Sequence, residues 1–184
     1  AQMGADVTCV YVTDGSSSKG NLSPQQLVAA RKKEAKQVQP ILGIDSLSFM
    51  DLPDQHAASD ESSQRKLKEI IEEFRPDLIY CPTLVDCHVD HIATGRILSD
   101  TLKQIACEGM TVRMYEINCP IPAEEINCVI DVTDTFKSKL AAIRVFKSQT
   151  LKFDGFLELN RLKAEMVRND HPAVHQVEAF IECD

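Results

Sequence analysis

Residues 77–95 read DLIYCPTLVDCHVDHIATG, an apolar run followed by two histidines and two aspartates within six positions. The run at 78–81 predicts a buried strand, and residues 92–107 predict a helix that ends before Gly109. The polar cluster therefore lies where a strand is followed by a helix. In open α/β sheets, ligands bind at the carboxyl ends of strands. We expect a functional site at this junction.

The two histidines of the cluster, His88 and His91, are three positions apart. On the first turn of a helix, this spacing points both imidazoles to one side. The positive end of the helix dipole disfavours imidazolium there, so both rings are expected to be neutral, as a metal ligand must be. An HxxH pair is also compatible with a surface helix start that carries incidental histidines. The motif alone leaves both interpretations open.

The rest of the chain alternates strands and helices. Strands are expected at 7–12, 47–50, 78–81, 112–117, 128–132 and 176–183, and helices at 24–42, 59–74, 92–107, 135–147 and 156–168. Ser23 and Gln26 form a capping box at the first helix, and Asp134 is expected to cap the helix at 135–147. This alternation predicts one α/β domain over residues 1–184, with a Rossmann-like, mostly parallel sheet and helices on both faces.

The first residues, 1–6, resemble the end of a helix and are followed at once by a strand. A doubly wound fold usually begins with a strand. The pattern therefore predicts that the first strand and most of one helix are missing ahead of Ala1.

Composition narrows the class of protein. The formal net charge of −8 over 184 residues argues against a nucleic-acid partner, because phosphate binding needs a basic surface. No apolar run approaches the roughly 20 residues of a transmembrane helix. The seven cysteines are odd in number and include no CxxC pair, which favours a reducing, cytoplasmic location. The sequence does not define an oligomeric state and is compatible with a homo-oligomer.

Several segments, in order along the chain, resemble the PIG-L/LmbE-like zinc-dependent de-N-acetylases. The family's second signature, H-x-D-H after a strand, matches residues 88–91, and further matching segments lie at 10–15, 31–43, 75–80, 115–116, 131–133 and 147–149. The family's first signature, H-P-D-D-E, is absent from the chain, and its expected place is just ahead of Ala1. The chain thus resembles an N-terminally truncated member of the family.

The resemblance implies roles for individual residues. His91 would be a ligand of a catalytic Zn²⁺ whose other ligands belong to the absent signature. His88 would act as an acid or stabilise the oxyanion, and Asp90 would orient its ring, although Asp90 is also a favourable first-turn carboxylate. Arg31 matches an arginine that contacts the sugar in relatives, but it also suits a solvated helix position. Asp86 would cap the helix or contact the substrate.

The function implied by the resemblance is zinc-dependent hydrolysis of the N-acetyl group of an N-acetylglucosamine-type sugar or glycoconjugate, with zinc-bound water as the nucleophile. The alternative is a catalytically inactive carbohydrate-binding or scaffolding domain of the same fold. A nucleotide-binding Rossmann domain is disfavoured because the chain has no GxGxxG motif. His171 and His175 have metal-pair spacing, but Pro172 between them favours surface or turn positions.

Overall fold

The computed structural model describes residues 4–17, 21–106, 109–149 and 154–183. Residues 1–3, on which part of the missing-strand prediction rests, and Cys107, the expected end of a helix, lie outside these ranges.

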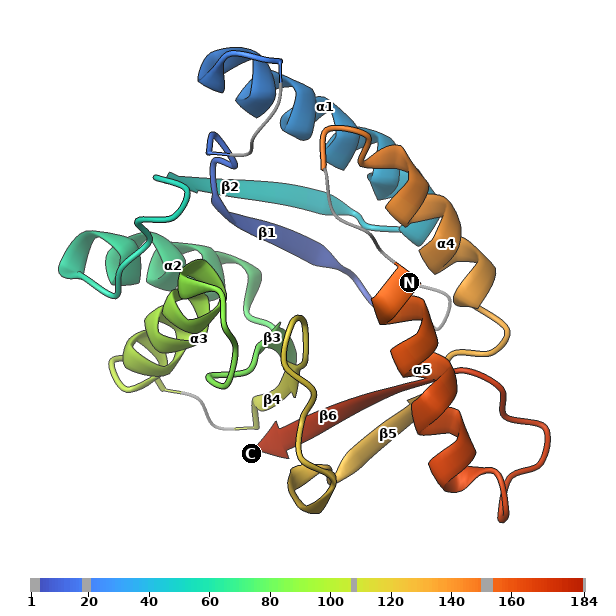
Figure 1. Cartoon of the computed structure of the whole chain (residues 1–184). Coiled ribbons are helices and arrows are strands. Elements are labelled where there is room, and N and C mark those ends of the chain that lie inside the picture. Colours follow the sequence, from blue (N-terminus) through green and yellow to red (C-terminus); the bar gives the residue numbers. More distant parts are fainter. Residues whose placement is uncertain (1–3, 18–20, 107–108, 150–153, 184) are drawn as a thin grey trace.

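The strands form two sheets (Figure 1). In the smaller sheet, β1 (Thr8–Thr13) pairs in parallel with β2 (Ser46–Leu52). In the larger sheet, β3 (Leu78–Pro82) pairs in parallel with β4 (Thr111–Tyr115). Each sheet therefore begins with the parallel pairing that the sequence predicts.

The larger sheet continues with antiparallel strands, in the order β3-β4-β6-β5. β6 (Val177–Cys183) lies between β4 and β5 (Cys128–Asp131) and is antiparallel to both. The predicted α/β class is confirmed. The larger sheet is mixed rather than mostly parallel, because the last strand of the chain enters it from the opposite direction.

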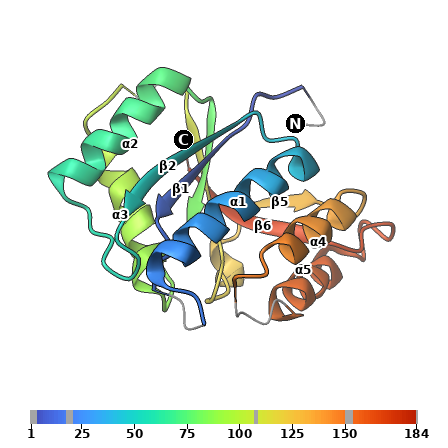
Figure 2. The ribbon, with the colours of Figure 1, turned by 90° about the horizontal axis from the view of Figure 1, so that it is seen from above.

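Helices cover both faces of the sheets (Figures 1 and 2). One face carries α2 (Glu61–Phe74) and α3 (Val89–Leu102). The other carries α1 (Pro24–Leu42), α4 (Phe136–Val145) and α5 (Asp154–Val167). This two-sided arrangement confirms the prediction, and it places the start of α3 beside the end of β3.

The core fixes α3 against both sheets. In one hydrophobic cluster, Ile97 of α3 is buried with Met50 and Leu52 of β2. In a second cluster, the next residue of the helix, Leu98, is buried with Cys81 of β3. Burying such side chains stabilises the fold by about 1.5–3 kcal/mol each. Because α3 is anchored to both sheets, its first turn is held in a fixed position.

Gly95 allows α3 to approach the end of β3 closely. A Cβ atom at this position would lie 2.8 Å from Cδ2 of Leu84 and 3.1 Å from the backbone oxygen of Pro82. The second contact is with backbone, which cannot move without displacing the strand end. A side chain at residue 95 would therefore push the helix away from the loop that carries the polar cluster.

The ends of two helices test the sequence predictions. α1 begins with the predicted capping box, in which the Ser23 hydroxyl accepts from the Gln26 backbone N–H. The prediction that Asp134 caps α4 is wrong, because Thr135 occupies the N-cap position and makes no side-chain capping bond.

A short 3₁₀ turn, η1 (Ala123–Glu125), lies between β4 and β5.

The predicted additional strand stays a prediction. In the described ranges, β1 pairs with β2 alone and β3 pairs with β4 alone. Figure 1 shows β1 as the strand of its pair nearer to the larger sheet. No helix within the described ranges is long and apolar enough to cross a lipid bilayer.

Candidate active site

The two histidines meet at the start of α3. His88 is the N-cap, with an extended backbone, so the helix begins three residues before the predicted Ile92. The imidazoles of His88 and His91 stack with ring centroids 4.6 Å apart and planes 24° apart. The side-by-side placement predicted from their spacing is therefore observed. If the Nδ1 atom of each ring is held in a hydrogen bond, the Nε2 atoms are the groups that can act on a ligand.

Asp86 organises the loop before α3. One of its carboxylate oxygens accepts from the backbone N–H of His88 at 2.7 Å. Asn118, after β4, donates to the same carboxylate from its backbone N–H and from its side-chain amide, both at 3.0 Å. The Asp86 side chain is only 1% exposed. Its position confirms neither a substrate contact nor a helix cap, because it binds the loop backbone instead.

The hydrogen bonds to Asp86 determine its charge. Burial of the carboxylate opposes ionisation, but the bonds from the backbone and side chain of Asn118 and from the backbone of His88 outweigh it. The pKa of Asp86 falls as a result to about 2. Asp86 is therefore a fixed negative charge beside the histidines at neutral pH.

His91 is oriented by Asp86. Its Nδ1 atom lies 3.2 Å from Oδ2 of Asp86 and 3.3 Å from the side-chain nitrogen of Asn118. Asn118 already donates to the carboxylate, and an ionised carboxylate can only accept, so we assign the ring proton to Nδ1. The lone pair of the neutral ring then lies on Nε2. A carboxylate that fixes this tautomer is the usual partner of a metal-binding histidine.

His88 has the opposite tautomer. Its Nδ1 accepts a hydrogen bond from the backbone N–H of Asp90 at 3.2 Å. A neutral imidazole with an accepting Nδ1 carries its proton on Nε2. The stacked pair therefore presents a hydrogen-bond donor, Nε2–H of His88, beside an acceptor, Nε2 of His91. Such a pair offers one group that can donate to a polarised oxygen and one group that can bind an electrophile.

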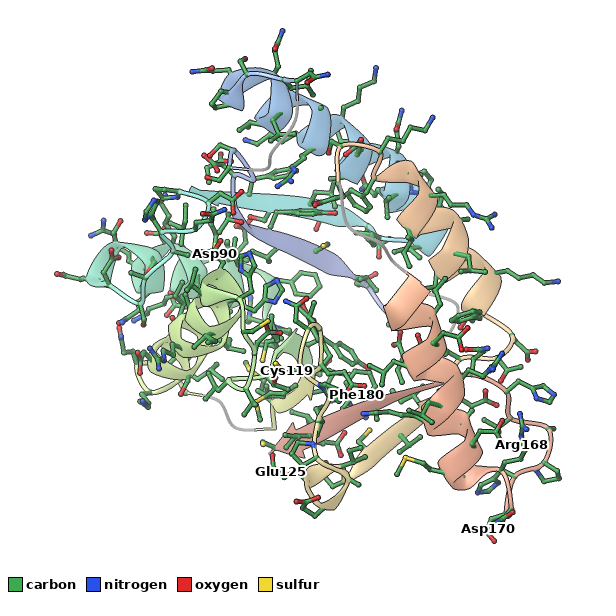
Figure 3. The ribbon with its side chains drawn as sticks, viewed as in Figure 1. Asp90, Cys119, Glu125, Arg168, Asp170 and Phe180 are labelled. Carbon is green, nitrogen blue, oxygen red and sulfur yellow. The ribbon has the colours of Figure 1, made fainter. Side chains whose placement is uncertain are left out.

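The orienting role predicted for the Asp90 carboxylate is corrected by the structure. Asp90 is only 4% exposed, and its two carboxylate oxygens accept from the backbone N–H groups of Gln55 at 2.7 Å and Ala57 at 3.2 Å. Figure 3 labels Asp90 at the start of α3. The residue contacts the His88 ring through its backbone, and its side chain instead holds the segment after β2. The orienting carboxylate is Asp86, and it acts on His91.

Arg31, predicted to contact the substrate, lies between the elements that border the site. Its guanidinium is 3.7 Å from Oδ2 of Asp54 and donates to the Gln149 side chain at 3.3 Å. A Cβ atom on Gly15 would clash with this guanidinium, so Gly15 makes room for it. Asp54 directly precedes Gln55, the residue bound to Asp90. The substrate contact of Arg31 stays a prediction.

Sequence reasoning missed Asn118. It follows β4, whose partner β3 ends just before the cluster, so both segments emerge at the same edge of the larger sheet. A polar residue just after a neighbouring parallel strand was the signal that could have identified it. Thr13 ends β1, and the adjacent Asp14 binds the backbone of Ser16 and Asp54, so this turn shapes the segment that carries Asp54.

The described residues do not form a complete metal site. Within the described ranges, no group of three or more His, Cys, Asp or Glu side chains is arranged to hold a metal ion. Catalytic Zn²⁺ normally has three protein ligands. Within the cluster, we assign an unprotonated Nε2 to His91 and a protonated one to His88. His171 and His175 are both exposed, as the sequence predicts.

A comparison with models of protein families shows which family the chain belongs to. A family model described as "GlcNAc-PI de-N-acetylase" (PIG-L) matches residues 1–102, more than half of the chain, including the histidine cluster. The chain belongs to the PIG-L family. This confirms the resemblance inferred from the sequence. The PIG-L match ends with the last residue of α3, so it covers β3 and the histidine cluster but not Asn118.

Relatives of this PIG-L chain include the diacetylchitobiose deacetylase of Thermococcus kodakarensis, 23% identical over 160 residues. The alignment covers 79% of the chain but only 60% of that curated relative's length.

Two solved structures share the fold. N,N'-diacetylchitobiose deacetylase from Pyrococcus horikoshii has a TM-score of 0.79 and 23% identity, covering 99% of this chain and 74% of that one. GalB, the 4-carboxy-2-hydroxymuconate hydratase of Pseudomonas putida, has a TM-score of 0.85 and 19% identity, covering 100% and 86%. The fold of this PIG-L member therefore occurs in proteins named for different reactions, so function must be argued from the site.

Proposed function

We propose that the protein hydrolyses the N-acetyl group of an N-acetylglucosamine-type sugar or glycoconjugate. Membership of the PIG-L family and the names of the two diacetylchitobiose deacetylases support this substrate class. The observation that carries the proposal is the stacked pair of His88 and His91, in which each Nδ1 has a fixed partner. We assign a different role to each Nε2.

Amide hydrolysis needs a nucleophile, a group that stabilises the developing oxyanion, and a proton for the departing amine. In the proposed mechanism, Nε2–H of His88 donates to the acetyl carbonyl oxygen as its negative charge grows. The backbone N–H of Asp90 holds this ring in place. Asp86 keeps Nε2 of His91 available as a Lewis base. Arg31 would bind a sugar hydroxyl.

We further propose that activity depends on Zn²⁺, as the family resemblance implies. When bound, zinc would supply a water with a pKa near 7 as nucleophile and polarise the carbonyl. The described residues do not hold the ion by themselves, because His91 offers one ligand and no group of three is present among them. The remaining ligands would have to come from residues outside the described ranges.

An additional strand between β1 and β3 is part of the same proposal. Within the described ranges each of these strands has one partner, so each exposes an edge of unpaired backbone groups. A strand parallel to both would pair with these edges. The residues at its carboxyl end would then lie beside the start of α3, where further ligands are needed.

The test is acetate release by the full-length protein. We expect acetate from N,N'-diacetylchitobiose and from N-acetylglucosamine derivatives. Release should stop on chelation with dipicolinate and return when Zn²⁺ is added. Acetate production that is unchanged by chelation would contradict the zinc proposal alone. If the zinc-loaded protein binds these sugars without releasing acetate, the deacetylase proposal is wrong and the inactive carbohydrate-binding domain is supported instead.

A further inference from the structure

We propose that Cys87 and Cys119 form a dithiol modification site that low-molecular-weight disulfides convert to an intramolecular disulfide. The site lies beside the candidate active site, since Cys87 is between Asp86 and His88 in the chain. This proposal does not depend on the deacetylase function.

The backbone geometry brings the two cysteines together. Asp86 and Asn118 are joined by two hydrogen bonds of 3.0 Å, one from the backbone and one from the side chain of Asn118. Each of these residues is followed directly by a cysteine, Cys87 on the loop before α3 and Cys119 on the segment after β4. Figure 3 labels Cys119 on that segment. The clamp between residues 86 and 118 therefore holds the two segments that carry the cysteines next to each other.

The two thiols interact. Desolvation, followed by the charge of the Cys119 thiolate, raises the pKa of Cys87, and a side-chain hydrogen bond with Cys119 adds to the rise. Small side-chain rotations would then bring the two sulfur atoms to the geometry that a disulfide needs. This contact distinguishes the pair from a single exposed cysteine.

Exposure differs among the described cysteines in a way that favours this pair. Cys87 is exposed and Cys119 is half-buried, so a small disulfide can reach them from solvent. Cys183, on β6, is also exposed, but the thiol whose pKa its charge helps to raise is that of Cys81, which is buried in the core. Reaction at Cys183 would therefore stop at a mixed disulfide, whereas the loop pair can proceed to an internal one.

The reaction is thiol–disulfide exchange with a disulfide R–S–S–R such as oxidised glutathione. One thiolate of the pair attacks R–S–S–R, which forms a mixed disulfide and releases one R–S⁻. The second thiolate then attacks the protein sulfur of the mixed disulfide and releases the second R–S⁻. The two thiol protons end on the released thiols, so two protein thiols and one R–S–S–R give one protein disulfide and two R–SH.

The experiment treats the protein with oxidised glutathione in mildly alkaline buffer and maps unreduced peptides by mass spectrometry. We expect a linked peptide pair containing Cys87 and Cys119, with the loss of two hydrogen atoms, and a higher Tm because the cross-link constrains the unfolded chain. Cys87→Ser and Cys119→Ser should each abolish the linked pair and leave a glutathione adduct on the remaining cysteine. The control Cys183→Ser should leave the linked pair unchanged.

Phenylarsine oxide, which bridges adjacent dithiols, gives a second measurement on the unmodified protein. We expect it to protect Cys87 and Cys119 together from alkylation. Persistent glutathione adducts at Cys87 with no linked peptide, or linkage of Cys87 to another cysteine, would overturn the proposal. Because both measurements use the unsubstituted chain, a variant that fails to fold does not affect them.

Discussion

In the full-length protein, His88→Ala is expected to lower kcat by about 10²–10⁴-fold while bound zinc is retained. The reason is geometric, since Nε2–H of His88 is the donor of the stacked pair and its Nδ1 is occupied by the Asp90 backbone. His91→Ala should instead remove both the metal and the activity, because it deletes the nitrogen that Asp86 presents as a ligand. Zinc content by atomic emission and acetate release are the two measurements.

The matched control is His171→Ala, which removes an exposed histidine remote in sequence from the cluster and should change neither quantity. Loss of zinc in His88→Ala with retention in His91→Ala would reverse the assignment. Full activity and full zinc content in both variants would mean that the two rings are incidental histidines at a helix start, the alternative that the sequence left open.

Asp86→Asn is expected to destabilise the fold by about 2 kcal/mol at neutral pH. The folded pKa of Asp86 is lowered to about 2, whereas an unfolded aspartate titrates near 3.9. A carboxyl with a depressed folded pKa stabilises the protein above its unfolded pKa. That contribution disappears as the pH falls through the folded pKa. The difference between the two proteins should therefore be complete above about pH 5 and be lost between about pH 4 and pH 2.

Urea denaturation across this pH range measures the difference directly. The side chain is 1% exposed, so solvent screening does not remove the effect. A stability difference that persists unchanged at pH 2, or one that is absent at pH 7, would contradict the assigned ionisation of Asp86. Asparagine keeps the size of the side chain, so cavity formation does not confound the comparison.

The order of elements was predictable because it depends on local patterns. Alternating apolar runs and the Ser23 capping box predicted α1, and the closing strand at 176–183 corresponds to β6. The start of α3 was placed too late because histidine is an uncommon N-cap, and the cluster was taken to precede the helix. The antiparallel β6 was not foreseen, since strand direction depends on how a long connection crosses the sheet.

The sequence predicted the local geometry of the candidate site but not its contacts with distant segments. The spacing of His88 and His91 was sufficient to place the rings together. The partners of the carboxylates were not predictable, because they come from distant segments: Asp86 binds Asn118, 32 residues away, and Asp90 binds Gln55, 35 residues away. A sequence shows that two carboxylates flank a histidine, but tertiary structure decides which of them reaches a ring.

The proposed mechanism depends on opposite tautomers in His88 and His91, which the Asp90 backbone and the Asp86 carboxylate fix. Long-range ¹⁵N–¹H correlation NMR of the imidazoles in the metal-free protein measures this directly. We expect His88 to carry its proton on Nε2 and His91 on Nδ1 at neutral pH, and Asp86→Asn to weaken the preference in His91 alone. The same tautomer in both rings, or rapid exchange between tautomers in both, would contradict this expectation.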